Sequence, residues 1–452
     1  MIPTTSAIDH AAIEALRREP SPWSAKGLPL AHKTASIADL AARHPRLGTG
    51  GFTFPLMTLS ESDLANNIAA LAEFSRSRGV DLAPHGKTTM APQLFERQLD
   101  AGAWGITAAT IDQLLVYRRF GVRRILLANE LVDAPALRWV IGEQGRDPDF
   151  EFVFYLDSMQ GVAVAAEALS GDTAAEALRA HAAADARIGS VRAGSLEAVV
   201  EIGLPGGRTG CRSVEDAIAV GRAATRVPGL RIVGIAGYEG LLGYAGGSAV
   251  VDAVRVYLSG LREALRAFVA ARILPSTREA MLTSAGSGYF DVVVDELRDA
   301  WAPDERPRVV IRPGSYVGHA EREGDDGPLQ RAGFPMRLRP AMLVWARVLS
   351  RPEPGLAFAS AGRRDLSWDV SMPVPRWIWR RGGARPVAAD TLNVRELNDQ
   401  HAFIDLPPSV ALEPGDLVAF GTTHPCTTFD RWQVIPIIDD DFAVIDAVRT
   451  FF

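Results

Sequence analysis

The sequence predicts a (β/α)8 barrel followed by a mainly antiparallel β domain. From about residue 52 to residue 316, short apolar segments alternate with segments of helical period. The alternation repeats about eight times over roughly 270 residues, which is the size of a (β/α)8 barrel. After about residue 330, short strand-like segments stand among proline- and glycine-rich turns, which indicates a separate β domain. A doubly wound open sheet is the alternative for the first part.

The expected strands and helices follow one another along the chain. Apolar runs predict the strands, and a 3.6-residue apolar period predicts the helices, as in 63–79, where Asp63 lies near the start and Gly79 at the end. Strands separated by helices in this way form parallel β-α units. The expected strands are 54–59, 80–87, 104–110, 123–130, 150–157, 195–203, 230–240, 280–288 and 307–316. The expected helices are 11–18, 63–79, 91–102, 110–121, 136–145, an alanine-rich region after residue 157, 214–226 and 251–273.

Three segments are therefore expected. Residues 1–50 form an N-terminal extension that packs on the β domain, residues 51–328 form the barrel, and residues 329–452 form the β domain. The expected strands of the β domain lie in 336–351, 356–362, 401–407 and 416–422.

Composition restricts the class of protein. Of the 452 residues 47% are hydrophobic and 23% are charged, as in ordinary soluble globular proteins. A net charge of −6 argues against nucleic acid or an anionic membrane as the main partner. The two cysteines, Cys211 and Cys426, make no disulfide framework and fit a reducing cytosol. The first twenty residues lack the pattern of a signal peptide and no apolar stretch spans a bilayer, so we expect a cytoplasmic protein.

The stretch LAPHGKTTMAP, residues 82–92, places Lys87 at the end of an expected strand. Strand ends carry the chemistry of parallel barrels. The chain has 48 lysines and arginines together, and only Lys26, Lys33 and Lys87 are lysines. Lysine, unlike arginine, forms a Schiff base with an aldehyde, and its pKa falls readily on burial. Lys87 is thus a candidate catalytic residue, and a surface lysine in a loop is the alternative.

Two glycine-rich turns follow the last expected barrel strands. A Schiff-base lysine suggests pyridoxal phosphate, which needs a phosphate cradle. SAGSGYF, residues 284–290, offers Gly286 and Ser287, and RPGSYVGH, residues 312–319, offers Ser315 and Tyr316. Backbone N–H groups and hydroxyls in such turns bind anions. Each turn alone is a weak signal, but their place matches the usual phosphate site of barrels.

Two further strand-end groups are candidates for binding the cofactor. Arg208, in GGRTGCR, has a guanidinium that is suited to a ring oxygen or a carboxylate. Tyr238, in GYEG, has a hydroxyl that is suited to a ring nitrogen. A solvated arginine and a buried core tyrosine are the respective alternatives.

The segment GTTHPCTTFDRW contains His424 and Cys426. In an extended segment, residues two apart point to the same side, and an imidazole with a thiolate suits Zn²⁺. Two protein ligands are fewer than a closed structural site requires, so a metal bound here would keep open positions for water or substrate. A lone H-x-C pair is by itself a weak motif.

In this order, these motifs resemble the D-serine dehydratase and D-threonine aldolase family of fold-type III pyridoxal-phosphate enzymes, which are relatives of alanine racemase. PHGKTT resembles the Schiff-base segment, GGRTGCR the arginine motif, GYEG the tyrosine segment, SAGSG and RPGSY the phosphate turns, and HPCTTF the metal motif. The resemblance covers about residue 52 to the C-terminus. It implies a barrel plus β domain, a homodimer with the site near the subunit interface, pyridoxal 5'-phosphate and a divalent metal, expected to be Zn²⁺. Thr89 stands where the family has a histidine, and the N-terminal extension is longer than usual.

The resemblance implies a reaction on a small D-amino acid. HPCTTF sits better with the dehydratase branch, so we expect dehydration and deamination of a D-3-hydroxy amino acid, such as D-serine or D-threonine, to a 2-oxo acid and ammonia. Retro-aldol cleavage to glycine and an aldehyde is the nearest alternative. A racemase has no use for the metal pair. A non-catalytic pyridoxal-phosphate-binding protein and a barrel without cofactor are alternatives of a different class.

Overall fold

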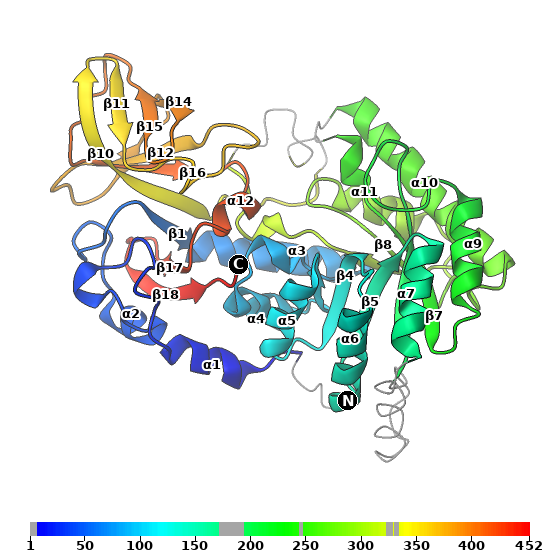
Figure 1. Cartoon of the computed structure of the whole chain (residues 1–452). Helices are drawn as coiled ribbons and strands as arrows, with labels where there is room; N and C mark the ends of the chain where they lie inside the picture. The colour runs from blue at the N-terminus through cyan, green and yellow to red at the C-terminus, as the bar shows by residue number, and fades with distance from the viewer. Residues whose placement is uncertain (1–6, 171–193, 244–246, 322–328, 330–333) are drawn as a thin grey trace.

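The computed structural model describes residues 7–170, 194–243, 247–321, 329 and 334–452. Figure 1 shows a barrel surrounded by helices and, beside it, a β domain that contains strands from both the start and the end of the chain. The expected (β/α)8 barrel with a mainly antiparallel β domain is confirmed. Among the described residues, no helix combines the length and the apolar character needed to cross a membrane.

The barrel sheet is parallel, with the strand order β2-β9-β8-β7-β6-β5-β4-β3. It closes between β2 and β3, where Trp104 N–H donates to Leu82 O (2.7 Å) and Thr107 N–H donates to Pro84 O (2.8 Å). The strands are β2 Asp81–Leu82, β3 Ile106–Ala108, β4 Arg124–Glu130, β5 Glu151–Leu156, β6 Leu196–Ile202, β7 Leu230–Gly237, β8 Met281–Ser284 and β9 Arg308–Ile311.

Alternate residues of these strands fill the barrel interior, as the two-residue period of a strand requires. The interior cluster consists of Ala83, Leu126, Val153, Tyr155, Val199, Ala236, Met281 and Val310. One position on β7 requires glycine, because a Cβ at Gly234 would overlap the carbonyl oxygen of Met281 on β8. The barrel is therefore a packed core with its strand ends free for a site.

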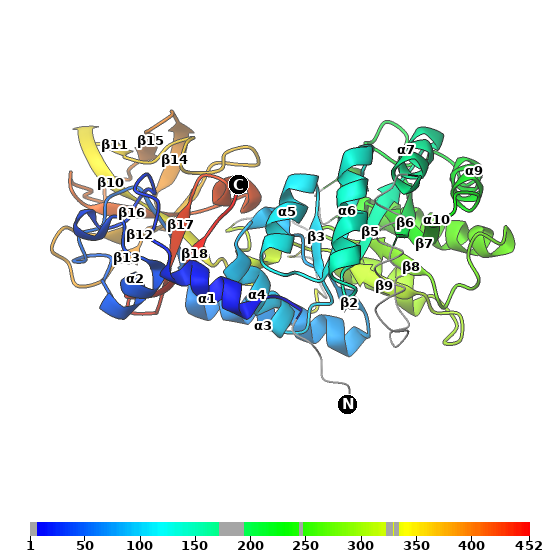
Figure 2. The same ribbon diagram turned by 60° about the horizontal axis from the view of Figure 1, so that its bottom comes forward.

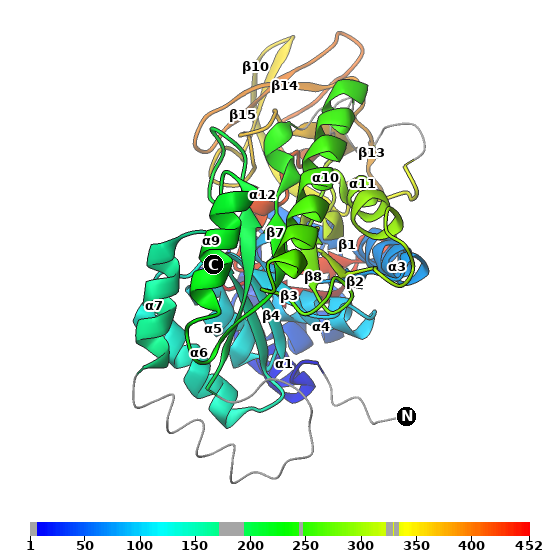
Figure 3. The same cartoon turned by 90° about the vertical axis from the view of Figure 1, so that its right-hand side faces the viewer.

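Helices cover the outside of the barrel (Figure 3). Several begin at side-chain caps, for example Thr110 before α5 and Asp133 before α6. The helices are α3 Glu61–Arg78, α4 Pro92–Asp100, α5 Ile111–Arg119, α6 Ala134–Arg146, α7 Met159–Leu169, α9 Val214–Ala224, α10 Ser248–Ala270 and α11 Phe290–Val294. Part of the expected alanine-rich helical region, residues 171–193, lies outside the described residues.

The β domain is built on a sheet with the order β13-β12-β16-β10-β1-β17-β18, from which β11, β15 and β14 branch at β10. The pairs are antiparallel except β1 with β17, which is parallel. The strands are β1 Leu56–Ser60, β10 Met342–Glu353, β11 Leu356–Ala359, β12 Val374–Trp379, β13 Val387–Ala388, β14 Asn393–Leu397, β15 Ala402–Asp405, β16 Leu417–Gly421, β17 Val434–Ile438 and β18 Val444–Arg449.

The first strand of the expected barrel series, 54–59, belongs instead to the β domain. β1 lies between β10 and β17, with Leu56 opposite Trp345. The barrel strands begin at β2, so the expected domain start at residue 51 differs from the observed topology. Leu56, Met57 and Leu59 are completely buried, and a strand buried on both faces has the same apolar pattern in either sheet.

The N-terminal segment contains α1 His10–Arg18 and α2 Ile37–Arg43, which lie beside β17 and β18 (Figure 2). Leu40 and Leu47 share a buried cluster with Trp345 and other residues of the β domain. Arg17 adds an ion pair with Asp446 of β18 (2.7 Å). Residues 25–47 therefore contribute to the core of the β domain, whereas the start of the segment contacts the barrel, where Asp9 N–H donates to Phe120 O (2.9 Å).

Replacing two glycines by alanine should have opposite effects. Gly234→Ala forces β7 away from β8, so the free energy of unfolding should fall by about 1–3 kcal/mol or more. A Cβ at Gly260, in α10, would lie in open space. Gly260→Ala should therefore raise the free energy of unfolding by about 0.5–1 kcal/mol. Urea unfolding of both variants is the measurement, and equal effects would contradict the close strand approach.

Candidate active site

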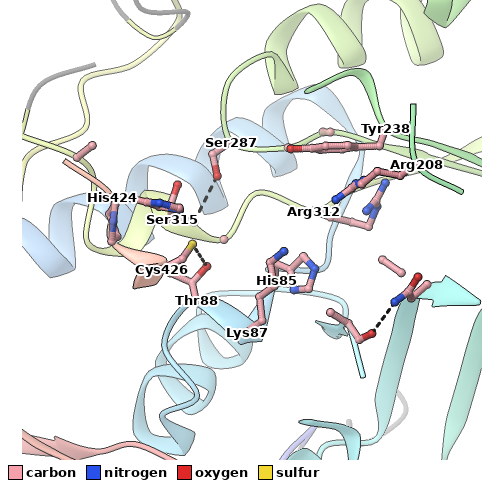
Figure 4. Close-up of a pocket in the computed structure, with 18 of the residues that line it drawn as sticks. His85, Lys87, Thr88, Arg208, Tyr238, Ser287, Arg312, Ser315, His424 and Cys426 are labelled. Carbon is pink, nitrogen blue, oxygen red and sulfur yellow. Dashed lines mark hydrogen bonds between the residues drawn. The ribbon is translucent and has the colours of Figure 1, made fainter. Parts of the chain in front are cut away.

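A cavity of about 900 Å³ opens at the carboxyl ends of the barrel strands. Its wall combines residues of the barrel with the segment of the β domain that contains His424 and Cys426, as Figure 4 shows. The described residues that line it include Lys87, Arg208, Tyr238, Gly286, Ser287, Ser315, His424 and Cys426, all of which the sequence singled out. Thr88 and Cys426, which are 338 positions apart in the chain, thus meet in one cavity.

Lys87 lies in the short 3-10 turn Gly86–Thr88 that follows β2. The turn packs closely on β3 and α5, because a Cβ at Gly86 would lie 2.5 Å from the hydroxyl oxygen of Tyr117. The Lys87 side chain extends into the cavity (Figure 4). Burial lowers its pKa, the nearby Cys426 thiolate opposes this, and the guanidinium groups of Arg208 and Arg312 lower it further. The amine is thereby made easier to deprotonate.

The two glycine-rich turns lie side by side. The backbone N–H of Ser315 donates to Ser287 Oγ at 3.3 Å. Gly314 lets the second turn approach the lysine segment, since a Cβ there would lie 2.7 Å from both His85 O and Thr88 Oγ1. Small residues therefore bring two sets of backbone and hydroxyl groups to one part of the cavity, which suits an anion.

Two residues of the expected phosphate cradle, Gly286 and Tyr316, have other contacts in the structure. The Gly286 N–H is already used, because it donates to the carboxylate of Glu239 (2.7 Å). The same buried carboxylate accepts from Ala285 N–H and from Ser284 Oγ. Tyr316 is buried outside the cavity lining, where its hydroxyl accepts from Gln98 Nε2 (2.9 Å). Its position after Ser315 in a 3-10 turn sends its side chain away from the opening.

Tyr238 is held by close packing. A Cβ at Gly240 or at Gly286 would lie 2.5 Å or 2.8 Å from its ring atoms, so both sites need glycine. The Arg208 guanidinium carbon lies 4.7 Å from the ring centroid. Burial and the charge of Glu239 raise the pKa of Tyr238, so its hydroxyl remains protonated at neutral pH. The two cofactor-binding candidates therefore form one unit.

His424 and Cys426 converge, but not through an extended segment. Pro425 has right-handed helical angles, and Cys426 begins the one-turn helix α12 Cys426–Phe429. Proline at a helix start is favourable because it has no N–H group to leave unpaired. Although the backbone here is helical rather than extended, the two side chains interact. This contact together with Asp369 raises the pKa of His424 to about 9. Burial opposes ionisation of Cys426, but hydrogen bonds from His424 and Thr88 lower its pKa overall.

The floor of the cavity contains polar residues that sequence reasoning missed. His85, Tyr155, Glu201 and Arg312 come from the strand ends and line the cavity. Arg312 donates to Thr283 Oγ1 (2.9 Å) and to Gly237 O (2.7 Å). His85 Nδ1, Tyr155 Oη and Glu201 Oε2 are buried and find no hydrogen-bond partner among the described residues. The sequence signal that could have found them is the two-residue period of a strand, which places these side chains on the inner face of the barrel.

The residues fit both groups that the sequence implied. For pyridoxal phosphate, the cavity provides a lysine amine, an anion-binding pair of turns, and buried polar atoms that lack partners within the described part of the chain. For a metal, His424 and Cys426 provide an imidazole and a thiolate, which suit Zn²⁺. No cluster of three or more His, Cys, Asp or Glu side chains suited to a metal occurs in the described ranges. Any metal here would therefore keep open positions.

Several known proteins resemble this chain in sequence and in fold. Residues 341–438 match the family described as "Putative serine dehydratase domain". The chain is 23% identical over 395 residues to a D-threonine aldolase from an Arthrobacter species, which covers 85% of this chain and 89% of the relative. The crystal structure of D-threonine aldolase from Filomicrobium marinum has a TM-score of 0.69 at 21% identity, covering 88% of this chain and 95% of the other.

D-threo-3-hydroxyaspartate dehydratase from Delftia sp. HT23 has a TM-score of 0.63 at 20% identity, covering 88% of this chain and 97% of the other. Solved forms of such a dehydratase include a histidine-to-alanine variant and a cysteine-to-alanine variant, the latter in a metal-free form; the two positions are two apart. The fold thus defines a barrel-plus-β-domain protein of the kind also found in alanine racemases. Within that class, the chain is similar in sequence to D-threonine aldolase, and residues 341–438 match the putative serine dehydratase domain.

Removing one carboxyl group near the cavity floor should change the pH dependence of stability. Burial and then the charge of Glu201 raise the pKa of Glu130 to about 8. The folded protein therefore binds a proton more tightly than the unfolded chain, and stability is lost as pH rises from about 4.5 to about 8. Glu130→Gln should thus increase the free energy of unfolding at pH 8 by up to about 1–3 kcal/mol, with little change at pH 5.

Denaturant unfolding of the Glu130→Gln variant at both pH values is the measurement. Glu279→Gln, which removes an exposed carboxyl group, is the matched control. A gain that is the same at pH 5 and at pH 8 would contradict the raised pKa.

Proposed function

We propose that this protein is a pyridoxal-phosphate- and metal-dependent lyase that dehydrates and deaminates a D-3-hydroxy amino acid, such as D-serine or D-threonine. The products would be a 2-oxo acid and ammonia. One observation carries the proposal: Thr88 Oγ1, next to Lys87, lies 3.3 Å from Cys426 Sγ. The lysine and the His424–Cys426 pair therefore face the same part of the cavity, where both can act on one small substrate.

Lys87 would hold the cofactor and then act as the base. When bound, pyridoxal phosphate supplies an aldehyde that captures the substrate amine and a ring that accepts electrons from Cα. The Lys87 amine, with its lowered pKa, is placed to take the proton from Cα. The positive charges of Arg208 and Arg312 help to lower the pKa of this amine.

Other side chains would fix the orientation of the cofactor. Ser287 and Ser315 would bind the phosphate, Arg208 the phenolic oxygen, and Tyr238 the ring nitrogen. The tight packing of Tyr238 between two glycine positions supports a fixed ring orientation. Gly286 would contribute by giving Tyr238 room rather than by donating its N–H, which Glu239 accepts.

His424 and Cys426 would hold a divalent metal, which we propose to be Zn²⁺. When bound, the metal supplies Lewis acidity toward the substrate β-hydroxyl. A structurally similar dehydratase has solved histidine and cysteine variants at positions two apart, and the cysteine variant is described as in the metal-free form, which supports a metal in a protein of this fold. The role of the chain is to hold the imidazole and thiolate beside Lys87, so that the hydroxyl and the Cα proton leave from one bound substrate.

Retro-aldol cleavage to glycine and an aldehyde is the second candidate. It is favoured by the similarity to D-threonine aldolases in both sequence and structure. It would use the same lysine and metal pair but would take the proton from the β-hydroxyl. A non-catalytic pyridoxal-phosphate-binding protein, a different class, needs no His424–Cys426 pair.

We also propose a cytoplasmic homodimer with the cavity near the subunit interface. Light scattering would measure the number of subunits.

Replacing Lys87 by alanine and by arginine should show whether the site requires imine formation or only a positive charge. Both Lys87→Ala and Lys87→Arg should lose the visible absorbance of the lysine-bound cofactor, because neither side chain forms an imine with the aldehyde. Turnover should fall by about 10²–10⁴-fold or more. Lys33→Ala, which removes a lysine outside the cavity lining, should keep both. Retained absorbance in the Lys87 variants would refute the assignment.

Product analysis should decide between the two lyase reactions. With D-serine and D-threonine as substrates, we expect ammonia and 2-oxo acids in equal amounts. Treatment with a chelator should abolish turnover while the absorbance of the lysine-bound cofactor remains, because Lys87 does not depend on the metal for its imine. Glycine and an aldehyde as products would favour the aldolase reaction, and full turnover in chelator would contradict the role of the metal.

A further inference from the structure

Asp369 lies against the proposed metal pair, in the loop between β11 and β12 of the β domain. Its Oδ2 lies 2.5 Å from Nδ1 of His424, and its Oδ1 accepts from Thr427 Oγ1 at 2.8 Å. The sequence motifs did not single it out, because it is 55 residues before His424. The carboxylate therefore contacts the segment 424–427 at two points.

The loop that carries Asp369 is fastened to the same segment on both sides. His424 N–H donates to Ser367 Oγ (3.1 Å), and Ser367 N–H donates to Thr428 Oγ1 (3.2 Å). On the other side, Thr423 Oγ1 donates to Ser371 O (2.8 Å). Ser367 is completely buried. These bonds hold Asp369 in place although its own side chain is 44% exposed.

The contact decides which ring nitrogen is left for a metal. A carboxylate accepts a hydrogen bond from an imidazole N–H, so Asp369 favours the tautomer with the proton on Nδ1. The lone pair of the neutral ring is then on Nε2. Carboxylates that bind the far nitrogen of a metal-ligating histidine fix its orientation and raise its basicity. Cys426, on the next turn, is fixed in a similar way by Thr88 of the barrel.

We propose that Asp369 is a positioning residue that orients His424 and sets the metal affinity of the His424–Cys426 pair. It acts through the histidine and does not itself touch the substrate or the metal. This inference rests on the proposed function, because it takes the pair to be a metal site.

The test compares Zn²⁺ affinity in three full-length variants that carry pyridoxal phosphate: Asp369→Ala, Asp369→Asn and Asp399→Asn. A chromophoric chelator competes for Zn²⁺ with each metal-free protein. Asp369→Ala should bind Zn²⁺ about 10–100-fold more weakly than the wild type. Asp369→Asn, which keeps an oxygen acceptor without the charge, should lose less. Asp399, 68% exposed in the same domain, is the matched control, and Asp399→Asn should bind Zn²⁺ as the wild type does.

Two further readings separate positioning from general damage to the fold. The melting temperature of the metal-free proteins should be unchanged, and the visible spectrum of bound Co²⁺ should change only in the Asp369 variants. Affinities of the Asp369 variants within about twofold of the wild type, or an equal loss in Asp399→Asn, would overturn the inference. A wild-type protein that binds no divalent metal would overturn the proposed metal site and this inference with it, whereas wild-type binding with unchanged variants would overturn the inference alone.

Discussion

The hydrogen bond between Thr88 and Cys426 joins the barrel to the β domain inside the cavity. Thr88 follows Lys87 directly in a tight 3-10 turn, and Cys426 begins a one-turn helix, so neither side chain is on a freely moving loop. Gly314 completes this junction, since a larger residue would collide with Thr88 and His85. The distance between the lysine amine and the imidazole–thiolate pair therefore depends on how the two domains pack. Positioning of this kind accounts for a large part of catalysis by preorganised sites.

Charge in the cavity is arranged in two parts. Lys87, Arg208 and Arg312 gather positive charge around the place where an anionic cofactor would lie, and the lowered pKa of Lys87 is one result. On the other side, His424 and Cys426 ionise in opposite senses and stabilise each other. The carboxylate of Glu239 belongs to neither group of charges, because it accepts hydrogen bonds within the turn 284–286. A buried carboxylate is tolerated there because several donors satisfy its oxygens.

Residues in short local motifs could be predicted from the sequence. Lys87 stands out by its chemistry at a strand end, and Ser287 and Ser315 by the glycine-rich turns around them. The cavity floor was harder, because inward-facing His85 and Arg312 become recognisable only when strand boundaries and register are known. Asp369 could not be predicted from the sequence for a different reason: its proposed role comes from a contact between two loops that have no common sequence pattern. Likewise β1 reads as a barrel strand because burial on both faces looks the same in either sheet.

The position of β1 also bears on how the chain is assembled during synthesis. β1 leaves the ribosome early, but its neighbours β10 and β17 begin 286 and 378 residues after it in the chain (342 − 56 and 434 − 56). The barrel between them consists of local β-α units that can pair as they emerge, whereas the sheet of the β domain must wait for the end of the chain. Cutting the chain near residue 329 would remove partners from β1 rather than release a complete domain. The lysine turn is thus formed from early segments, and the imidazole–thiolate pair reaches it only when the last tenth of the protein has been made.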